Sequence, residues 1–325
     1  MLNSVLNRME LLRVPLFSFK DSWFVFLALL LTTAILLGTN LPGDNRLMYS
    51  LQDSGHFLIF TLLTLIALWP YRRVRDRSIW PVLALVLIFG LLIEGAQYLI
   101  GRDPSLYDVI LDLLGIAAGG IIYTGFIRRS LAPHLSIAIL LLLVLSAFAQ
   151  PLYWYIAYQV RTDQFPRLID PDDYFSRALI EGSEGGVVRH VDLPGDWSLP
   201  ADLDIDSCAY VTLLDGRWPG VDMQEPESDW RGYERLELLI YSDQSENLPL
   251  TLRIHDQNHN RRLEDRYNLS LVVQPGYNHF SLPLHEVEDA PSGRTMDMAA
   301  ISDVMIFATR NHIGRGFCLL SMGLQ

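Results

Sequence analysis

Residues 79–100 read IWPVLALVLIFGLLIEGAQYLI, an apolar run in which Glu94 is the single charged side chain. A helix needs about 20 predominantly apolar residues to cross the hydrocarbon core of a bilayer. The run meets this length. It therefore predicts a transmembrane helix that carries one acid near its end.

Four further apolar runs surround this one in the first half of the chain. They cover residues 23–39, 55–70, 106–127 and 135–158. Half of the residues are hydrophobic and 19% are charged, below the roughly 25% of soluble domains. This composition excludes a disordered or nucleic-acid-coating protein. We predict an all-α bundle of five transmembrane helices over residues 1–160, with the lipid bilayer as its surroundings.

Charge divides the chain into two parts. Residues 1–160 hold 11 basic and 9 acidic side chains, whereas residues 161–325 hold 14 basic and 28 acidic ones. The net charges of the two parts, +2 and −14, add to −12 for the whole chain. This uneven distribution indicates at least two domains. Lys20 is the only lysine, so a Walker A motif is absent, and two cysteines are too few for a zinc ribbon.

Basic residues in the short loops predict the orientation of the helices. The N-terminal segment and the four loops that follow contain 3, 1, 4, 1 and 2 Arg or Lys residues. Cytoplasmic loops are the ones enriched in these residues. We therefore expect a multi-pass protein of the bacterial inner membrane, with its N-terminus in the cytoplasm and residues 161–325 outside it.

Polar residues inside the apolar runs gather toward the outer side of this topology. Glu94 and Gln97 lie three apart on one helix face, and Asp108 and Asp112 lie four apart on another. Glu94 and Asp112 are each about 9 Å inside their helices, measured from the same side. Ionisable residues at such depth usually face a bundle interior or a watery cavity and mark function.

We expect these side chains to form one pocket, open to the outer surface, for binding or acid–base chemistry. Four carboxylates stand against one Arg and one His, so a bound divalent cation or protonation of some carboxyls would offset the negative charge. The alternative is that the residues only join three helices by hydrogen bonds. The predicted pocket residues are Asp53, His56, Glu94, Gln97, Arg102, Ser105, Asp108 and Asp112.

Residues 115–119 read GIAAG and place two glycines four apart in a predicted helix. Such small-xxx-small faces let a neighbouring backbone approach closely. A helix interior has no free N–H groups to bind phosphate. We expect close helix packing here.

The polar residues also form a pattern that resembles the VanZ-like family of membrane proteins. The chain has DSGHF at 53–57, EGAQ at 94–97, GRDPSLYD at 101–108 and DLLG at 112–115. The family pattern is D-x-x-H, E-x-x-Q, R-x-x-S-x-x-D and N-x-x-G in this order, and Asp112 replaces its more usual Asn. The resemblance implies a membrane fold in the cell envelope and a link to resistance against the glycopeptide teicoplanin, but no reaction.

The second half of the chain shows the pattern of β-strands. Apolar residues recur at every second position in stretches such as 236–240 and 250–254, with turn signals such as Gln-Pro-Gly at 274–276. Short strands with one apolar face predict an all-β sandwich over residues 187–325. Residues 161–186 are acidic and contain several Pro and Gly, and we expect a linker there.

This half also resembles jelly-roll carbohydrate-binding modules of the galactose-binding-like type. The resemblance rests on GRWPG at 216–220, DWRGY at 229–233, LRIHD at 252–256 and DRYN at 265–268. It implies an extracytoplasmic jelly roll that binds glycans, with aromatic rings stacked on a sugar and polar groups bonded to it. The candidate glycan-binding residues are Trp230, Tyr233, Arg253, His255, Asp256, His259, Asp265 and Arg266.

Two alternatives compete with glycan binding at these residues. One is a solvated sandwich face with the aromatic rings in the core. The other is a metal site formed by His255, Asp256 and His259. Cys208 and Cys318 stand in an early and the last predicted strand, so they either form a disulfide or are ordinary buried residues.

Three functions are consistent with the sequence. The first is a cell-envelope protein whose bundle holds a polar headgroup or peptide beside a glycan-recognising module. The second is an enzyme that acts on a lipid-linked or peptidoglycan-type substrate through the outward carboxylates. The third is a scaffold whose helical half is only a membrane anchor. The buried acids count against it, because an anchor does not require them. The expected partners are the bilayer and an envelope glycan or lipid-linked precursor, and no nucleic acid.

Overall fold

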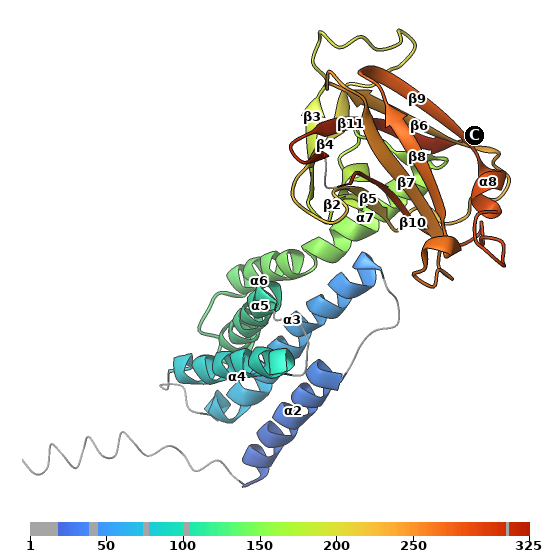
Figure 1. Cartoon of the computed structure of the whole chain (residues 1–325). Coiled ribbons are helices and arrows are strands. Elements are labelled where there is room, and N and C mark those ends of the chain that lie inside the picture. The colour runs from blue at the N-terminus through green and yellow to red at the C-terminus, as the bar shows by residue number, and fades with distance from the viewer. Residues whose placement is uncertain (1–18, 39–44, 74–77, 100–104, 310–311) are drawn as a thin grey trace, which may run out of the picture. The chain divides into compact units, whose positions relative to one another are not determined.

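The computed structural model divides into two compact units, Met1–Trp154 and Tyr155–Gln325, here called the helical unit and the β unit. Figure 1 shows the helices of the first and the strands of the second. The structure describes residues 19–38, 45–73, 78–99, 105–309 and 312–325.

Three helices are long and apolar enough to span a membrane. They cover Arg46–Arg72, Trp80–Leu99 and Leu106–Ile127, and the bent pair α6 and α7 counts as a fourth candidate. The predicted number of five crossings stays a prediction. The helices are α2 (Phe19–Gly38), α3 (Arg46–Leu68), α4 (Trp80–Leu99), α5 (Leu106–Ile122), α6 (Pro133–Ala147) and α7 (Ala149–Gln164), with short turns η1 (Trp69–Arg73) and η2 (Tyr123–Ile127).

Apolar side chains cover the outside of the helical unit. Leu58 and Leu62 on α3, and Leu85 and Leu92 on α4, are each more than half exposed. Soluble proteins rarely expose contiguous apolar surface on this scale, whereas a bilayer requires it. The buried polar residues of this unit are Thr32, Ser50, Ser54, His56, Thr64, Glu94, Gln97, Asp112 and Ser136.

Helix α3 begins earlier than the sequence predicts. Asn45 is its N-cap, and the Asn45 side chain accepts a hydrogen bond of 2.9 Å from Met48 N. This cap satisfies a free amide of the first turn and lets the helix start in a polar segment. Asp53 and His56 therefore lie about two and three turns inside α3, and the expectation that they open the helix is wrong.

The predicted helix over residues 135–158 is two helices, α6 and α7, bent by 52°. Pro151 explains the break, because proline lacks an N–H and its ring clashes with the carbonyl four residues before it. That carbonyl belongs to Ala147, and it accepts a hydrogen bond of 2.9 Å from Ser54 Oγ on α3. The break thus exposes a backbone oxygen that ties α6 to α3.

Helices α3 and α5 pack closely and run parallel. A Cβ on Gly115 would lie 2.5 Å from Phe57 O, and one on Gly119 would lie 2.8 Å from Thr61 O. Only glycine permits this separation, so the expectation of close packing at the two glycines is confirmed.

The β unit is built from two antiparallel sheets. One has the order β3-β4-β11-β6-β9, with β1 also paired to β11, and the other has the order β2-β5-β10-β7-β8. The strands are β1 (Arg167–Ile169), β2 (Ile180–Ser183), β3 (Gly186–Asp192), β4 (Ser207–Leu213), β5 (Gly220–Gln224), β6 (Arg235–Ser242), β7 (Leu248–Asp256), β8 (Tyr267–Val273), β9 (Gly276–Pro283), β10 (Ile301–Phe307) and β11 (Gly316–Leu324), with α8 (Leu284–Glu288) after β9.

Alternating residues of both sheets form the core. Leu236, Leu238 and Ile240 on β6 are fully buried, as are Leu252 and Ile254 on β7. These are residues of the predicted apolar faces, so the period-two pattern is confirmed.

The expectation of a linker over residues 161–186 is wrong. Strand β1 pairs with β11, and β2 pairs with β5. Leu168, Ile169 and Ile180 bring apolar side chains from this segment into the core. The segment is therefore part of the sandwich, because its few apolar residues find partners far along the chain.

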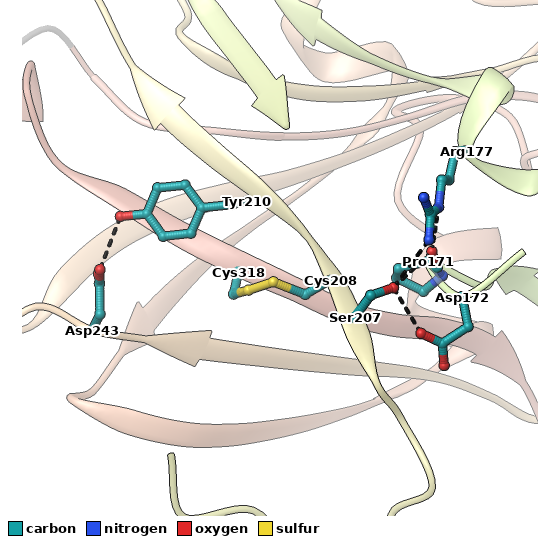
Figure 2. The surroundings of a disulfide bond; sticks show 8 residues. All are labelled: Pro171, Asp172, Arg177, Ser207, Cys208, Tyr210, Asp243 and Cys318. Carbon is teal, nitrogen blue, oxygen red and sulfur yellow. Dashed lines mark hydrogen bonds between the residues drawn. A yellow bond between two sulfur atoms is a disulfide. The ribbon is translucent and has the colours of Figure 1, made fainter. Parts of the chain in front are cut away.

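A disulfide joins Cys208 on β4 to Cys318 on β11, as Figure 2 shows. The two strands are neighbours in the first sheet, and both cysteines are fully buried. Beside it, the Tyr210 hydroxyl donates to Asp243, and burial with this hydrogen bond raises the pKa of Tyr210 to about 12. The disulfide is packed among apolar side chains that include Trp197, whose ring stacks on Tyr241.

Candidate functional site

One histidine and two acids meet inside the helical unit. His56 comes from α3, Glu94 from α4 and Asp112 from α5, and we call them the buried polar cluster. Each offers one potential ligand atom, and these atoms lie within 4.8 Å of one another. The three residues are only 7%, 6% and 2% exposed. An apolar bundle thus holds two acids and one base in direct proximity.

The helix directions explain why residues so far apart in sequence meet. Gly90 on α4 lies against Asp112, and Gly120 at the other end of α5 lies near Leu83, so α4 runs antiparallel to α5. Glu94, near the end of α4, therefore lies level with Asp112 near the start of α5. This agrees with the depth expected from the sequence.

Gly90 is a site residue that the sequence analysis missed. A Cβ at this position would lie 2.7 Å from Asp112 Oδ2 and 3.1 Å from the ring of Phe60. Gly90 precedes Glu94 by one helical turn, so the two share a face of α4. The sequence does contain a pattern that indicates this role, namely a glycine four residues before Glu94.

The cluster is incompletely hydrogen-bonded. His56 Nδ1 lies 2.9 Å from Asp112 Oδ1, and the His56 ring lies parallel to the ring of Phe60. Both carboxylate oxygens of Glu94 are buried, and no described side chain donates a hydrogen bond to either; the backbone N–H of Ser105 approaches the carboxylate without a bond of normal geometry. Asp108 Oδ1 is also buried without a hydrogen-bond partner among the described residues. Buried polar atoms normally have partners, so these oxygens need an explanation.

The other predicted pocket residues have different roles. Gln97 Nε2 donates to Leu36 O at 3.2 Å and joins α4 to α2. Ser105 is the N-cap of α5 and accepts from two backbone amides. Asp53 and Asp108 are only partly buried and lie one turn before His56 and Asp112 in their helices.

Gln97 and Ser105 therefore fit the alternative in which polar residues only join or cap helices. Arg102 lies outside the described residues. That all eight residues form one pocket, open to the outer surface, stays a prediction.

Of the two candidate glycan-binding aromatics, Trp230 is packed inside the β unit and Tyr233 is partly buried against its core. Trp230 is 1% exposed, belongs to the core and donates from its indole N–H to Glu227 O at 2.8 Å. Tyr233 packs edge-on against Phe165 at 5.3 Å between ring centroids. The expectation that Trp230 stacks on a sugar is wrong, because its ring is buried in the core and leaves no face open to a ligand.

Asp256 and Asp265 are held by Arg294, a residue that the sequence analysis missed. Arg294 Nη1 and Nη2 lie 2.6 and 2.8 Å from the two Asp256 oxygens, and Arg294 Nε lies 2.5 Å from Asp265. Burial alone would raise the pKa of Asp256, but hydrogen bonds from Arg294 and from Asp297 N bring it below its usual range. Hydrogen bonds from Arg294 and from Asn260 N lower the pKa of Asp265 to about 2.

This network contradicts the alternative in which His255, Asp256 and His259 form a metal site. Both Asp256 oxygens are already bonded to Arg294, and His259 Nδ1 lies 2.8 Å from Asp265 O. His255 instead stacks on His259, with 4.5 Å between ring centroids. Of the described residues, only the buried polar cluster has the arrangement of a metal site.

Arg253 and His255 lie on the outer face of β7, opposite the buried Leu252 and Ile254, as the sequence predicts. His255 Nε2 is 3.0 Å from Asp303 on β10. Burial alone would raise the pKa of Asp303, but this hydrogen bond lowers it.

Neighbouring side chains extend this face. The Arg253 guanidinium lies over the ring of Phe307, 4.6 Å from its centroid. Burial lowers the pKa of Arg266, whose charge is favoured by Asp303. We call Arg253, His255, Arg266 and Asp303 the charged sheet face.

No protein-family model and no curated protein matches the chain. Among solved structures it is similar to the family 11 carbohydrate-binding module from Clostridium thermocellum in complex with a β-1,3-1,4-mixed-linked tetrasaccharide, with 13% identity, a TM-score of 0.34, and coverage of 45% of this chain and 86% of that one. The family 11 module of a cellulosomal cellulase of Clostridium thermocellum gives 14% identity, a TM-score of 0.31, and coverage of 45% and 85%. An exo-β-agarase gives 11% identity, a TM-score of 0.35, and coverage of 46% and 23%. Each of these matches covers less than half of this chain.

Proposed function

We propose that this chain is a cell-envelope membrane protein whose helical unit binds the polar group of a lipid-linked or peptidoglycan-type ligand at the buried polar cluster. The observation that carries the proposal is the burial of His56, Glu94 and Asp112 side by side in a bundle with an apolar outside. A charged residue in hydrocarbon costs roughly 2.5–3.5 kcal/mol on insertion scales. Helix packing alone would be served by apolar residues, so the cluster serves a ligand.

The cluster has the groups needed for proton transfer. Asp112 accepts a hydrogen bond from the His56 imidazole, an arrangement that orients the ring and favours one tautomer. Glu94 has no side-chain donor among the described residues, so its carboxylate is able to accept or hold a proton from a bound group. These roles also suit the alternative in which the protein is an enzyme on the same class of substrate.

Teicoplanin susceptibility of a bacterial strain that expresses the full chain tests this proposal. Glu94→Gln keeps the shape of the side chain and removes its charge, so we expect it to abolish any protection that the wild type gives. Gly95→Ala is the matched control, because a Cβ there meets no atom within 4 Å. Full protection by Glu94→Gln, at the same amount of inserted protein, would exclude a role for the acid.

The orientation in the membrane requires its own test. Reporter fusions after residues 48, 76, 103, 131 and 165 should alternate, with extracytoplasmic activity at 48, 103 and 165. Cytoplasmic activity at 165 would overturn the proposal, because the polar cluster would then open toward the wrong compartment.

A second proposed function is glycan binding by the charged sheet face. Arg253 Nε and Arg266 Nε are buried, and no described residue accepts a hydrogen bond from either. Arg253 also lies over the ring of Phe307, which is only 4% exposed, so the described residues of this face offer guanidinium donors and no open ring. Polar groups placed in this way fix the orientation of a polar ligand such as a sugar.

Co-sedimentation of the detergent-solubilised full chain with purified peptidoglycan tests this second function. Arg253→Met should reduce the bound fraction, whereas Arg231→Met, which removes an exposed arginine, should not. Equal binding by wild type and Arg253→Met would remove the charged sheet face as the binding site.

A further inference from the structure

We propose that His56, Glu94 and Asp112 together bind one divalent transition-metal cation of the zinc class. The inference deepens the proposed function and rests on it in one respect, namely that the cation would hold an oxygen of the ligand. The metal site itself stands on the geometry, the charge and the unsatisfied hydrogen bonds of the buried polar cluster.

The geometry of the three residues is close to that of a metal site. Zinc binds imidazole nitrogen and carboxylate oxygen at about 2.0–2.2 Å, so two ligand atoms on one tetrahedral ion lie about 3.4 Å apart. His56 Nδ1 and Asp112 Oδ1 are 2.9 Å apart, and all three ligand atoms lie within 4.8 Å. A shift of up to about 1.4 Å by the flexible Glu94 side chain would complete the set.

Glu94 supplies a second and independent observation. It is 6% exposed, and no described side chain donates a hydrogen bond to either of its oxygens; only the backbone N–H of Ser105, among the described residues, approaches them. A buried carboxylate without a partner is strongly destabilised, and the common remedies are a paired charge or a metal ion. Glu94 is also the acid of the cluster that does not take part in the hydrogen bond between His56 and Asp112.

The charges of the cluster match a divalent cation. Glu94 and Asp112 carry two negative charges when ionised, and a neutral His56 carries none. One divalent ion therefore makes the cluster neutral, which removes most of the cost of burying the charges in an apolar bundle. A hydrogen bond between His56 and Asp112 leaves the charge of Glu94 without such compensation.

The donor types select the class of metal. Imidazole together with carboxylates suits Zn²⁺, Mn²⁺ or Fe²⁺, whereas Ca²⁺ and Mg²⁺ prefer sites built from oxygen alone. Three protein ligands leave a position of a four-coordinate ion open. A phosphate or hydroxyl oxygen of an envelope precursor would fill that position.

Gly90 provides the space that Asp112 needs. A methyl group here would lie 2.7 Å from Asp112 Oδ2. Gly90→Ala should therefore displace a metal ligand without changing any ligand atom. Weaker metal binding by Gly90→Ala would therefore come from a displaced ligand and not from a change in the charge of the cluster.

Metal content of the purified full chain in detergent tests the proposal. The protein, carrying no histidine tag, is stripped with EDTA, dialysed against Zn²⁺ or Mn²⁺ and analysed by mass spectrometry of the elements. We expect about one equivalent of one of the two metals. Glu94→Gln, Asp112→Asn and His56→Ala should each lower the affinity by about 10-fold or more, whereas Gly95→Ala and the exposed-acid variant Asp229→Asn should bind as the wild type does.

X-ray absorption of the wild-type protein gives a readout that does not depend on variants that fold poorly. One nitrogen and two carboxylate ligands would support the site. Less than 0.1 equivalent of either metal, or equal binding by wild type and Glu94→Gln, would overturn it.

The outcomes for the metal and for the proposed function are distinguishable. If Glu94→Gln loses teicoplanin protection but the wild type binds no metal, the proposed cation site is overturned and the proposed function is not. Metal binding by the wild type with full protection by Glu94→Gln would support the cation and overturn the functional role.

Discussion

Replacing Arg294 by Met should destabilise the β unit strongly. Arg294 is the common partner of Asp256, whose side chain is fully buried, and Asp265, whose side chain is 5% exposed. Met keeps much of the length and apolar stem of the side chain but removes its charge and donors. Two buried carboxylates would then lose their shared cation, and each would keep one backbone amide as a donor.

The size of the effect follows from these contacts. Two hydrogen bonds from Arg294 to the buried Asp256 are lost, each worth about 1.5–3 kcal/mol, together with the bond to Asp265. Removing one partner of a buried ion pair costs about 3–5 kcal/mol, because the remaining charge stays buried. A domain of 150–250 residues loses roughly 2–4 °C in melting temperature per kcal/mol, so we expect a decrease of about 6–20 °C.

Thermal unfolding of the full chain in detergent checks this, with hydrogen exchange of peptides from β7 and β8 used to follow the β unit separately. Arg231→Met is the control, because Arg231 and Asp229 form an exposed pair, and such pairs contribute little to stability. Combining Arg294→Met with Asp256→Asn and Asp265→Asn should recover part of the loss. A melting temperature within 2 °C of the wild type for Arg294→Met would refute the reasoning.

Three further predictions follow from the described contacts. Acid should weaken the β unit as the pH falls from about 4 to about 2, because the pKa of Asp265 is lowered to about 2 in the folded protein and is about 3.9 when unfolded; Asp265→Asn should flatten this loss in denaturant titrations at several pH values. Replacing both Cys208 and Cys318 by Ala should lower the free energy of unfolding by about 2–4 kcal/mol, and equal stability of the wild type with and without reductant would contradict this. Gly115→Val should separate α3 from α5 and reduce the monodisperse fraction in size-exclusion chromatography, whereas Gly95→Ala should not.

The sequence predicts the helical unit well because hydrocarbon leaves few choices. A backbone without water must satisfy its hydrogen bonds internally, so each long apolar run has to be a helix. Antiparallel neighbours then put Glu94 and Asp112 at similar depth before any coordinates are known. The break before Pro151 was missed, because the apolar composition continues through it and only Ser54 on another helix satisfies the freed carbonyl.

The hydrogen-bond partners of the polar side chains could not be predicted from the sequence. Gln97 bonds to a carbonyl on α2, and its spacing from Glu94 alone suggested a shared pocket. Asp256 resembled a metal ligand until Arg294, on a later loop, was found to occupy both of its oxygens. Such partners lie far apart along the chain, and local pattern carries no information about which of several acids a given arginine meets.

By itself, the sequence determined the long apolar helices of the first half, the strands of the second and the buried face of each strand. These properties follow from the period and length of apolar residues, which act locally. Only the tertiary structure decided that β1 and β2 complete the sandwich, that Trp230 belongs to the core and that Glu94 has no side-chain donor among the described residues. These depend on which surfaces pack together, because burial and hydrogen bonding are properties of a neighbourhood assembled from distant segments.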